Sequence, residues 1–420
     1  MKGIITLLLI GLATWLMVHN SLHRVEFHKN YAYSMDEIET FRHFPKALYH
    51  IGLKLWFDNN IIGAARFFRQ TVDQNMFDMD AWFKLAQARI AKGDSNTAHA
   101  ILRFSEHLPE NVFRWKWDQI LLANELGAKK TFIKGINFLV KHGKKLQDAF
   151  QLFDGFTNRN SNLAIQELDT ENLPSYLEWL MRWGRSEDAW IVWKKIVERG
   201  VQDEDTRLKY IHFLVNLKQI ERADQVRKGS KEDVKGMTNA GFENEITNRG
   251  FDWRYTPDRK GKWTIRRSMT SAVNGTYCLT IRFEGKENIS FGHLYQIVPV
   301  IPETQYLLTY KWRSRDLTTD QGPFVDIHGY DCDGIYAKGP MMLDTHGWQK
   351  QDIEFAVPKA CHAVVVRLNR RPSKRFDSKI AGRLWLDDFK LETRKVLKSL
   401  TNNKLIVTSQ SDNNARNKKN

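Results

Sequence analysis

The densest cluster of side chains able to bind a metal or move a proton lies between residues 326 and 334. It reads Asp326-x-His328-x-x-Asp331-x-Asp333-Gly334. Asp326 and His328 could supply a carboxylate and an imidazole from one strand edge, provided that the two converge on one point. The stretch from Asp331 to Gly334 also fits a turn between strands, because Asp and Gly tolerate turn backbone. We favour the turn, and the sequence identifies no catalytic residue.

Signatures of several enzyme classes are absent from the sequence. It contains no phosphate-binding glycine loop, no Gly-x-Ser-x-Gly motif and no His-Glu-x-x-His motif. Paired carboxylates for glycoside hydrolysis have no sequence signature, since only their separation in space identifies them. The sequence therefore favours a non-enzymatic binding protein, with a polysaccharide lyase or hydrolase as the alternative.

Apolar and polar residues alternate along several segments of the C-terminal half, which would place polar side chains on one face of each strand. Val325 and Ile327, for example, alternate with Asp326 and His328. The side chains that oppose apolar neighbours are Arg282, Lys311, Arg313, Asp326, His328, Tyr330, Arg367 and Asn369. If several share one sheet, they form a basic face whose cations suit the carboxylates or sulfates of a glycan and whose tyrosine suits a pyranose ring. The alternative is an ordinary solvated sheet face.

These short alternating segments predict an antiparallel β-sandwich over roughly residues 237–394. The stretch Asn239-Ala240-Gly241-Phe242-Glu243, with Phe251-Asp252-Trp253, resembles the opening of carbohydrate-binding jelly rolls of the galactose-binding-like class. Gly382-Arg383-Leu384-Trp385-Leu386-Asp387-Asp388 matches the closing strand of that pattern. The resemblance implies a jelly roll. It also implies a candidate structural calcium ion held by Glu243 with Asp387 or Asp388, and the alternative is a pair of capped turns.

Residues 37–228 carry a helical pattern with a 34-residue repeat. Ala64 and Ala98 are 34 residues apart, as are Ala189 and Ala223. Small residues at this interval let the two helices of a hairpin approach closely and stack on the next hairpin. With Trp82, Leu85, Ala86, Ala98 and Pro109, one unit resembles a tetratricopeptide repeat. The resemblance implies a helical superhelix of roughly four to six hairpins that binds a protein partner.

Composition and charge limit the class of partner. The 420 residues are 42% hydrophobic and 12% aromatic, which is typical of a folded chain. The net charge of +15 suggests acidic polysaccharide, membrane head groups or nucleic acid as partners, and the alternative is an ordinary solvated basic surface. Nucleic acid ranks lowest among these partners, because the cations are scattered and no recognition motif accompanies them. Cys278, Cys332 and Cys361 leave two alternatives open, one disulfide or three buried thiols.

The two ends and the middle of the chain complete the predicted domain organisation. An apolar run from Ile4 to Val18 predicts a signal anchor over residues 1–22, with a cleaved signal peptide as the second choice and a buried helix as the third. Polar residues 229–236 predict a linker, and residues 395–420 predict a disordered basic tail. This arrangement predicts a single-pass protein of a bacterial inner membrane, with its bulk in the periplasm.

The predicted fold class is therefore a multidomain α + β protein, a helical repeat array followed by an antiparallel jelly roll. The predicted function is a membrane-anchored scaffold that holds a protein partner on its repeats and an acidic glycan on its sandwich. The resemblances suggest an accessory role in envelope or exopolysaccharide biosynthesis or export. A scaffold whose sandwich is purely structural is a further alternative.

Overall fold

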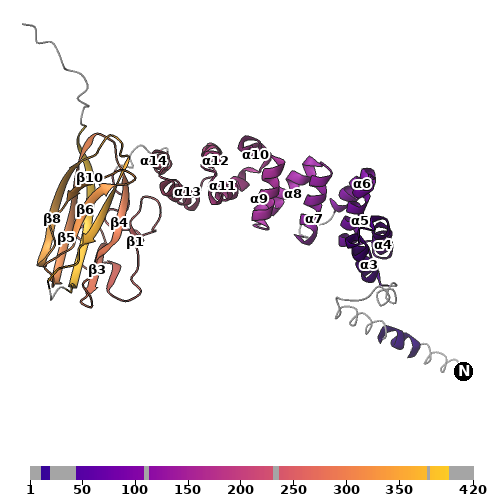
Figure 1. The fold of residues 1–420 in the computed structure, drawn as a ribbon, viewed down its shortest axis with the longest axis horizontal. Helices are drawn as coiled ribbons and strands as arrows, with labels where there is room; N and C mark the ends of the chain where they lie inside the picture. Colours follow the sequence, from indigo (N-terminus) through magenta and orange to yellow (C-terminus); the bar gives the residue numbers. More distant parts are fainter. Residues whose placement is uncertain (1–10, 19–43, 108–112, 230–235, 376–378, 397–420) are drawn as a thin grey trace, which may run out of the picture. The chain divides into compact units, whose positions relative to one another are not determined.

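The computed structural model describes residues 11–18, 44–107, 113–229, 236–375 and 379–396. The chain forms two compact units, residues 1–201 and residues 202–420. The first unit is helical, and the second joins a helical hairpin to a β-sandwich (Figure 1). This confirms the predicted fold class, an N-terminal helical region followed by an antiparallel sandwich.

The first unit is a succession of helices joined by short turns. In chain order they are α3 (Pro45–Phe57), α4 (Ile61–Gln74), α5 (Met79–Ala91), α6 (Ser95–Ser105), η1 (Phe113–Trp115), α7 (Lys116–Glu125), α8 (Lys129–Lys141), α9 (Leu146–Phe156), α10 (Ser161–Glu167), η2 (Thr170–Asn172), α11 (Leu173–Arg182) and α12 (Ser186–Glu198). Side chains of Asn60, Asp78 and Asp94 accept hydrogen bonds from backbone N–H groups at the starts of α4, α5 and α6. These caps satisfy N–H groups that have no partner inside the helix, and so they fix where each helix begins.

Small residues of the predicted repeat lie where helices touch. Ala64 and Ala98 are fully buried in α4 and α6. A Cβ atom placed on Gly52 of α3 would lie 2.6 Å from the ring of Phe68 in α4, so only glycine permits this approach. The repeat interval also separates bonded side chains, since Arg114 donates to Asp80, 34 residues earlier, at 2.8 Å. Pro109 lies outside the described residues.

The second unit opens with α13 (Glu204–Asn216) and α14 (Ile220–Lys228) and continues as two antiparallel sheets. Sheet A has the strand order β1-β4-β9-β6-β7 and sheet B the order β2-β3-β10-β5-β8. The strands are β1 (Arg254–Tyr255), β2 (Trp263–Ser268), β3 (Cys278–Glu284), β4 (Phe291–Pro299), β5 (Thr304–Leu317), β6 (Phe324–Gly329), β7 (Ile335–Lys338), β8 (Asp344–Ala356), β9 (Ala363–Arg370) and β10 (Ala381–Val396). Strands adjacent in a sheet come from distant parts of the chain, as expected for a sandwich with crossing connections.

The core of the sandwich follows the alternation seen in the sequence. Leu279, Ile281 and Phe283 of β3 point inward and meet Val364 and the other apolar residues of β9 across the interior. Because successive side chains of a strand point to opposite faces, the residues between them lie on the outside. The predicted inward and outward positions of these strands are therefore confirmed.

The helical hairpin α13–α14 packs on the outer face of sheet A. The Tyr330 hydroxyl donates to the Val215 carbonyl at 2.9 Å, and the Gly250 N–H donates to His212 Nδ1 at 3.2 Å. Ile297 of β4 and its cross-strand neighbour Val365 of β9 lie outside the sandwich core cluster yet are buried. Helix α14 contacts β4, and this explains how an outward-facing isoleucine is only 1% exposed.

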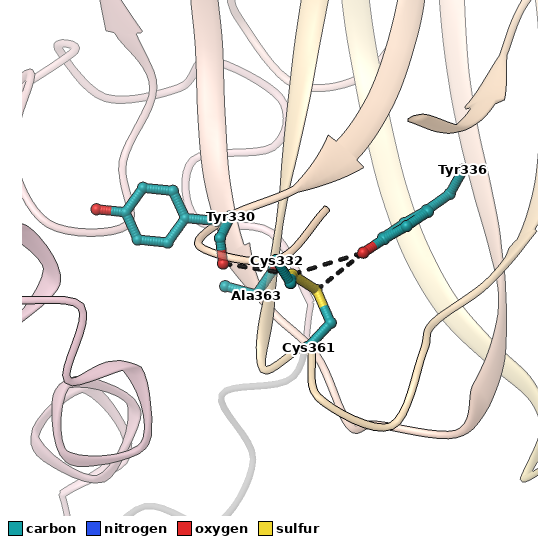
Figure 2. The surroundings of a disulfide bond; sticks show 5 residues. All are labelled: Tyr330, Cys332, Tyr336, Cys361 and Ala363. Carbon is teal, nitrogen blue, oxygen red and sulfur yellow. Dashed lines mark hydrogen bonds between the residues drawn. A yellow bond between two sulfur atoms is a disulfide. The ribbon is translucent and has the colours of Figure 1, made fainter. Parts of the chain in front are cut away.

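A disulfide joins the turn after β6 to the loop before β9. It links Cys332 to Cys361, while Cys278 is a buried free thiol. Of the two alternatives that the cysteine count left open, the structure has the single disulfide. The Tyr336 hydroxyl points at the bond and lies 3.5 Å and 3.3 Å from the two sulfur atoms, whereas the ring of Tyr330 points away from it (Figure 2).

The predicted membrane anchor needs correction. Residues 11–18 form exposed helix, and the rest of the predicted segment 1–22 lies outside the described residues. Within the part of the chain that the structure describes, no helix has both the length and the apolar character needed to cross a membrane. The prediction of a single-pass inner-membrane protein facing the periplasm is therefore wrong by this finding. Residues 230–235 of the predicted linker and 397–420 of the predicted tail also lie outside the described residues.

Candidate functional site

The outer face of sheet B carries a groove of about 380 Å³, which we call the arginine groove. Its lining combines cations, hydroxyls and one indole: Thr264, Arg266, Arg267, Ser268, Thr270, Thr280, Arg282, Glu284, Arg383 and Trp385. Four of these ten side chains are arginines and one is a carboxylate. The groove is therefore strongly positive.

Strand register brings these residues together from three neighbouring strands. Arg282 of β3 pairs with Thr264 of β2 on one side and with Arg383 of β10 on the other. One pleat along, Thr280 pairs with Arg266 and with Trp385. Neighbouring strands lie about 4.8 Å apart, so a chain crossing them would meet a new polar group at each strand.

Trp385 anchors two guanidinium groups. The ring is only 4% exposed, because Arg313 lies 5.0 Å and Arg383 5.6 Å from its centre. A guanidinium held beside an indole can still donate N–H groups to an anion. Trp385 thus positions Arg383 in the groove, while Arg313 lies outside the lining and donates to Ser271, and the indole does not itself present a bare aromatic platform.

Half of the positive charge in the groove is uncompensated. Arg282 lies 3.2 Å from Glu284, and Arg267 forms an ion pair with Glu245. Arg266 and Arg383 have no carboxylate within ion-pair distance among the described residues. Guanidinium groups presented in this way suit planar anions such as carboxylates and sulfates.

The structure divides the sequence-predicted binding residues between the two sheets. Arg282, Lys311 and Arg313 belong to the outer face of sheet B. The other five belong to sheet A or to the turn beside it: Asp326, His328, Tyr330, Arg367 and Asn369. They therefore do not form one continuous face.

Three of the sheet A residues form hydrogen bonds with one another. Arg367 donates to both carboxylate oxygens of Asp326 at 3.0 Å and 2.8 Å, and Asn369 donates at 2.7 Å. Burial alone would raise the pKa of Asp326, but His328, Arg367 and Asn369 hold it well below its ordinary value of 3.8. A buried carboxylate that is already paired in this way is a poor proton acceptor, which disfavours the acid–base interpretation of this cluster.

The remainder of the predicted metal or acid–base cluster forms a turn, as the favoured alternative predicted. Asp331 and Gly334 both have positive φ, and they lie between β6 and β7. Asp331 forms an ion pair with Lys218 of the α13–α14 hairpin, and Tyr330 contacts the same hairpin. Tyr330 is thus committed to a contact inside its own unit.

Sequence reasoning missed Arg266, Arg383 and Trp385 as binding residues. Arg383 and Trp385 lie in the quoted closing motif, and Arg266 follows the alternation of Trp263 and Ile265. The period-two pattern of those two segments could have identified the three residues as outward-facing. It could not show that β2, β3 and β10 are neighbours, which is what makes these residues a group.

The residues expected to bind calcium form a hydrogen-bonded clasp. Glu243 accepts the N–H groups of Thr276 and Tyr277, while Asp387 accepts that of Val273 at 2.8 Å. Asp388 instead pairs with Lys311 on the outer face. Across the described ranges, no group of three or more His, Cys, Asp or Glu side chains could hold a metal ion. Oxygens of Glu243 and Asp387 are thus already used as acceptors of backbone hydrogen bonds, and nothing below depends on a calcium ion.

This clasp makes a stability prediction. Asp387 is fully buried, and its oxygens also accept the N–H groups of Asn274 and Asp388. Replacing Asp387 by alanine leaves these backbone donors without a partner, so we expect the free energy of unfolding to fall by about 3 kcal/mol. Urea unfolding of the full chain measures this loss.

The matched control is Asp388→Asn, which removes a partly exposed ion pair, tolerates the positive φ of this residue and should cost less than about 1 kcal/mol. Equal losses in the two variants would contradict the clasp. A rise of several degrees in the melting temperature of the unmodified chain on adding calcium, absent from Asp387→Ala, would instead support the calcium site.

No protein-family model and no curated protein sequence matches this chain. Solved structures similar to its sandwich region include the CBM22-1–GH10 modules of Clostridium thermocellum endo-1,4-β-D-xylanase 10B complexed with xylohexaose (13% identity, 39% of this chain and 29% of that chain, TM-score 0.27). Another is TmCBM61 in complex with β-1,4-galactotriose (18% identity, 38% of this chain and 97% of that chain, TM-score 0.27). A third is a xylan-binding domain from CBM22 (10% identity, 38% of this chain and 96% of that chain, TM-score 0.28). At these identities and TM-scores the likeness carries no argument about the ligand of this chain. The proposal for that ligand is argued from the geometry described above.

Proposed function

We propose that the sandwich binds an acidic polysaccharide in the arginine groove without cleaving it. The observation that carries this proposal is the pair of uncompensated guanidinium groups of Arg266 and Arg383 beside Trp385. Isolated cations on a sheet face normally find carboxylate partners nearby or simply extend into water. Here they gather in a groove together with hydroxyl side chains, which is the composition that a charged sugar requires.

The two sheets differ in their availability to a ligand. On sheet A, the hairpin α13–α14 covers part of the outer face, and Asp326 neutralises Arg367. On sheet B, the groove is open and carries excess positive charge. This difference favours sheet B as the binding face.

A polysaccharide fits the groove better than a small anion does. Thr264, Ser268, Thr270 and Thr280 also line it. The hydroxyls of Ser268 and Thr270 bond to each other and that of Thr280 is buried, so Thr264 contributes the hydroxyl best placed to match a sugar hydroxyl. Because the groove crosses three strands, a chain of sugars can engage several of its groups at once. A single carboxylate would use only one guanidinium.

The first unit has a separate role in this proposal. We expect its helical hairpins to act as a tetratricopeptide-type array that holds a protein partner, so that the chain connects this partner to a glycan. The buried small residues and the 34-residue interval between Asp80 and Arg114 support that interpretation. The protein would then be an adaptor and not an enzyme.

Binding of the full chain to polygalacturonate, with neutral xylan as the comparison, tests the glycan proposal. We expect salt-sensitive binding to polygalacturonate only. The double variant Arg266→Ala/Arg383→Ala should weaken it at least about tenfold, since each lost charge-assisted hydrogen bond is worth about 1.5–3 kcal/mol. Isothermal titration calorimetry at two salt concentrations measures the change.

The control is Arg371→Ala/Arg394→Ala, which removes the same charge from exposed positions outside the groove. Binding that falls equally in both double variants reports net charge and not a site, and it would overturn the proposal. Shortening of the polysaccharide by the protein would establish the enzyme alternative instead.

A further inference from the structure

We propose that a second groove, on helix α8 of the first unit, docks an acidic peptide segment of a partner protein that also carries apolar side chains. This groove has a volume of about 660 Å³ and lies between α8 and the α10–η2 segment. The inference deepens the part of the proposed function that gives the first unit a protein partner, and it is independent of the arginine groove.

Lysines from one face of α8 form the rim of this groove. Lys129, Lys130, Lys134 and Lys141 line it, against Glu167 and Asp169 from the opposite wall. From Lys129 to Lys141 the helix advances about 18 Å, at 1.5 Å per residue. About six residues of extended peptide cover this length.

The floor of the groove is apolar. Ile133 and Phe138 form it, both half-buried. Asn137 also lines the groove, but its amide is used internally, because it donates to the Glu167 carbonyl at 3.0 Å and accepts from the Asp169 N–H at 2.8 Å. The floor therefore offers contact to apolar side chains, and its one amide is already hydrogen-bonded within the protein.

An aromatic cluster extends the floor at one end. Phe138 lies 4.4 Å from the ring of His142 and 5.2 Å from that of Phe113. Lys116 lies 5.1 Å from the centre of the Phe138 ring. Phe113 is an exposed large apolar residue, so this end of the surface combines cations with accessible aromatic area.

The existing ion pairs show that the rim accepts carboxylates. Lys129 lies 2.7 Å from Glu167, and Lys141 lies 2.8 Å from Glu171. Between these two ends, Lys130 has no ion pair among the residues that the structure describes. With Glu171 counted, the four lining lysines face three carboxylates, so the groove keeps a net positive charge and charge complementarity favours an acidic occupant.

The same floor argues against a glycan in this groove. A sugar presents hydroxyl groups on most sides and needs side-chain amides, hydroxyls or guanidiniums to meet them. Here Ile133, Phe138 and the methylene stems of the lysines occupy those positions. A peptide with alternating acidic and apolar side chains satisfies the rim and the floor together.

Fluorescence anisotropy of the full chain with a fluorescein-labelled peptide of alternating Glu, Leu and Phe residues tests the proposal. The comparison peptide contains Glu alone at the same length. We expect the unmodified chain to bind the mixed peptide and the variant Lys130→Glu/Lys134→Glu to bind it at least about tenfold more weakly. Each substitution replaces an attraction to a peptide carboxylate by a repulsion. The polyglutamate peptide should bind much more weakly.

The control variant Lys54→Glu/Lys92→Glu reverses two exposed charges elsewhere in the same unit and should keep the affinity. Circular dichroism melting of each variant checks that the helices remain folded. No binding, equal binding of the two peptides, or equal loss in the two double variants overturns the groove. The variant Arg266→Ala/Arg383→Ala should bind the mixed peptide as the unmodified chain does. This result would show that the peptide site and the arginine groove are independent, so that failure of one proposal is distinguishable from failure of the other.

Discussion

Replacing Arg367 by alanine is expected to lower the free energy of unfolding of the second unit by about 3–5 kcal/mol. The reason is the asymmetry of its ion pair, since Asp326 is only 1% exposed while the Arg367 side chain is 32% exposed. Removing the arginine leaves a buried carboxylate with only Asn369 and the more distant His328, 3.8 Å away, beside it. Urea unfolding of the full chain, followed by near-ultraviolet circular dichroism, measures the loss.

The same variant should weaken a pH dependence. In the unmodified chain the pKa of Asp326 is held below its ordinary value of 3.8, so its contribution to stability is present above that pH and is lost on further acidification. Without Arg367 the pKa of this carboxyl should rise, although His328 and Asn369 still oppose the effect of burial. Acidification should then cost the variant less stability than it costs the unmodified chain.

Arg282→Ala is the matched control for Arg367→Ala. Its side chain is 57% exposed and pairs with Glu284 on the surface, so its loss should cost less than about 1 kcal/mol. Similar costs for the two arginines would show that Asp326 finds water or another donor when Arg367 is removed. Parallel pH profiles of Arg367→Ala and the unmodified chain would contradict the electrostatic account.

The second large effect concerns the hairpin α13–α14. A truncated chain of residues 237–396 should be less stable than residues 202–396 by about 3–6 kcal/mol, because Ile297 and Val365 lose their cover and each buried aliphatic side chain contributes about 1.5–3 kcal/mol. We also expect the shorter chain to self-associate through this newly exposed apolar area. Urea unfolding and sedimentation velocity measure the two effects.

Tyr330→Phe in the longer chain isolates one part of this contact. It removes only the hydrogen bond to the Val215 carbonyl, so it should cost about 1 kcal/mol. Equal stability of the two truncated chains would support the sequence-predicted boundary at residues 229–236. A loss of about 3–6 kcal/mol in the shorter chain would instead place the boundary of the folded unit near residue 201.

The sequence predicted most of the fold because its signals are local. Period-two alternation in Leu279–Phe283 and in Val325–His328 marks strands with one face on the core, and the structure has both. Likewise Ala64 and Ala98 mark close helix contacts in the first unit. The attachment of α13–α14 to the sandwich was not predictable, because Val215 and Tyr330 meet across more than a hundred residues of chain.

The candidate site was predictable only residue by residue. Alternation identified Arg282 and Arg367 alike as outward-facing, but strand order places them on opposite sheets. It also leaves one arginine in an open groove and pairs the other with a buried aspartate. Whether an outward cation is free to bind depends on its cross-strand neighbours, and these are a property of the topology.

The Cys332–Cys361 disulfide has a mechanical consequence. The two cysteines are 29 positions apart, and β7 and β8 lie between them. If the protein connects a glycan to a partner, tension on the chain passes through the disulfide and bypasses this segment. About 100 Å of extended chain then stays unavailable to stretching, at roughly 3.4 Å per residue. The bond thus makes the sandwich a stiffer and shorter tether than its length in residues implies.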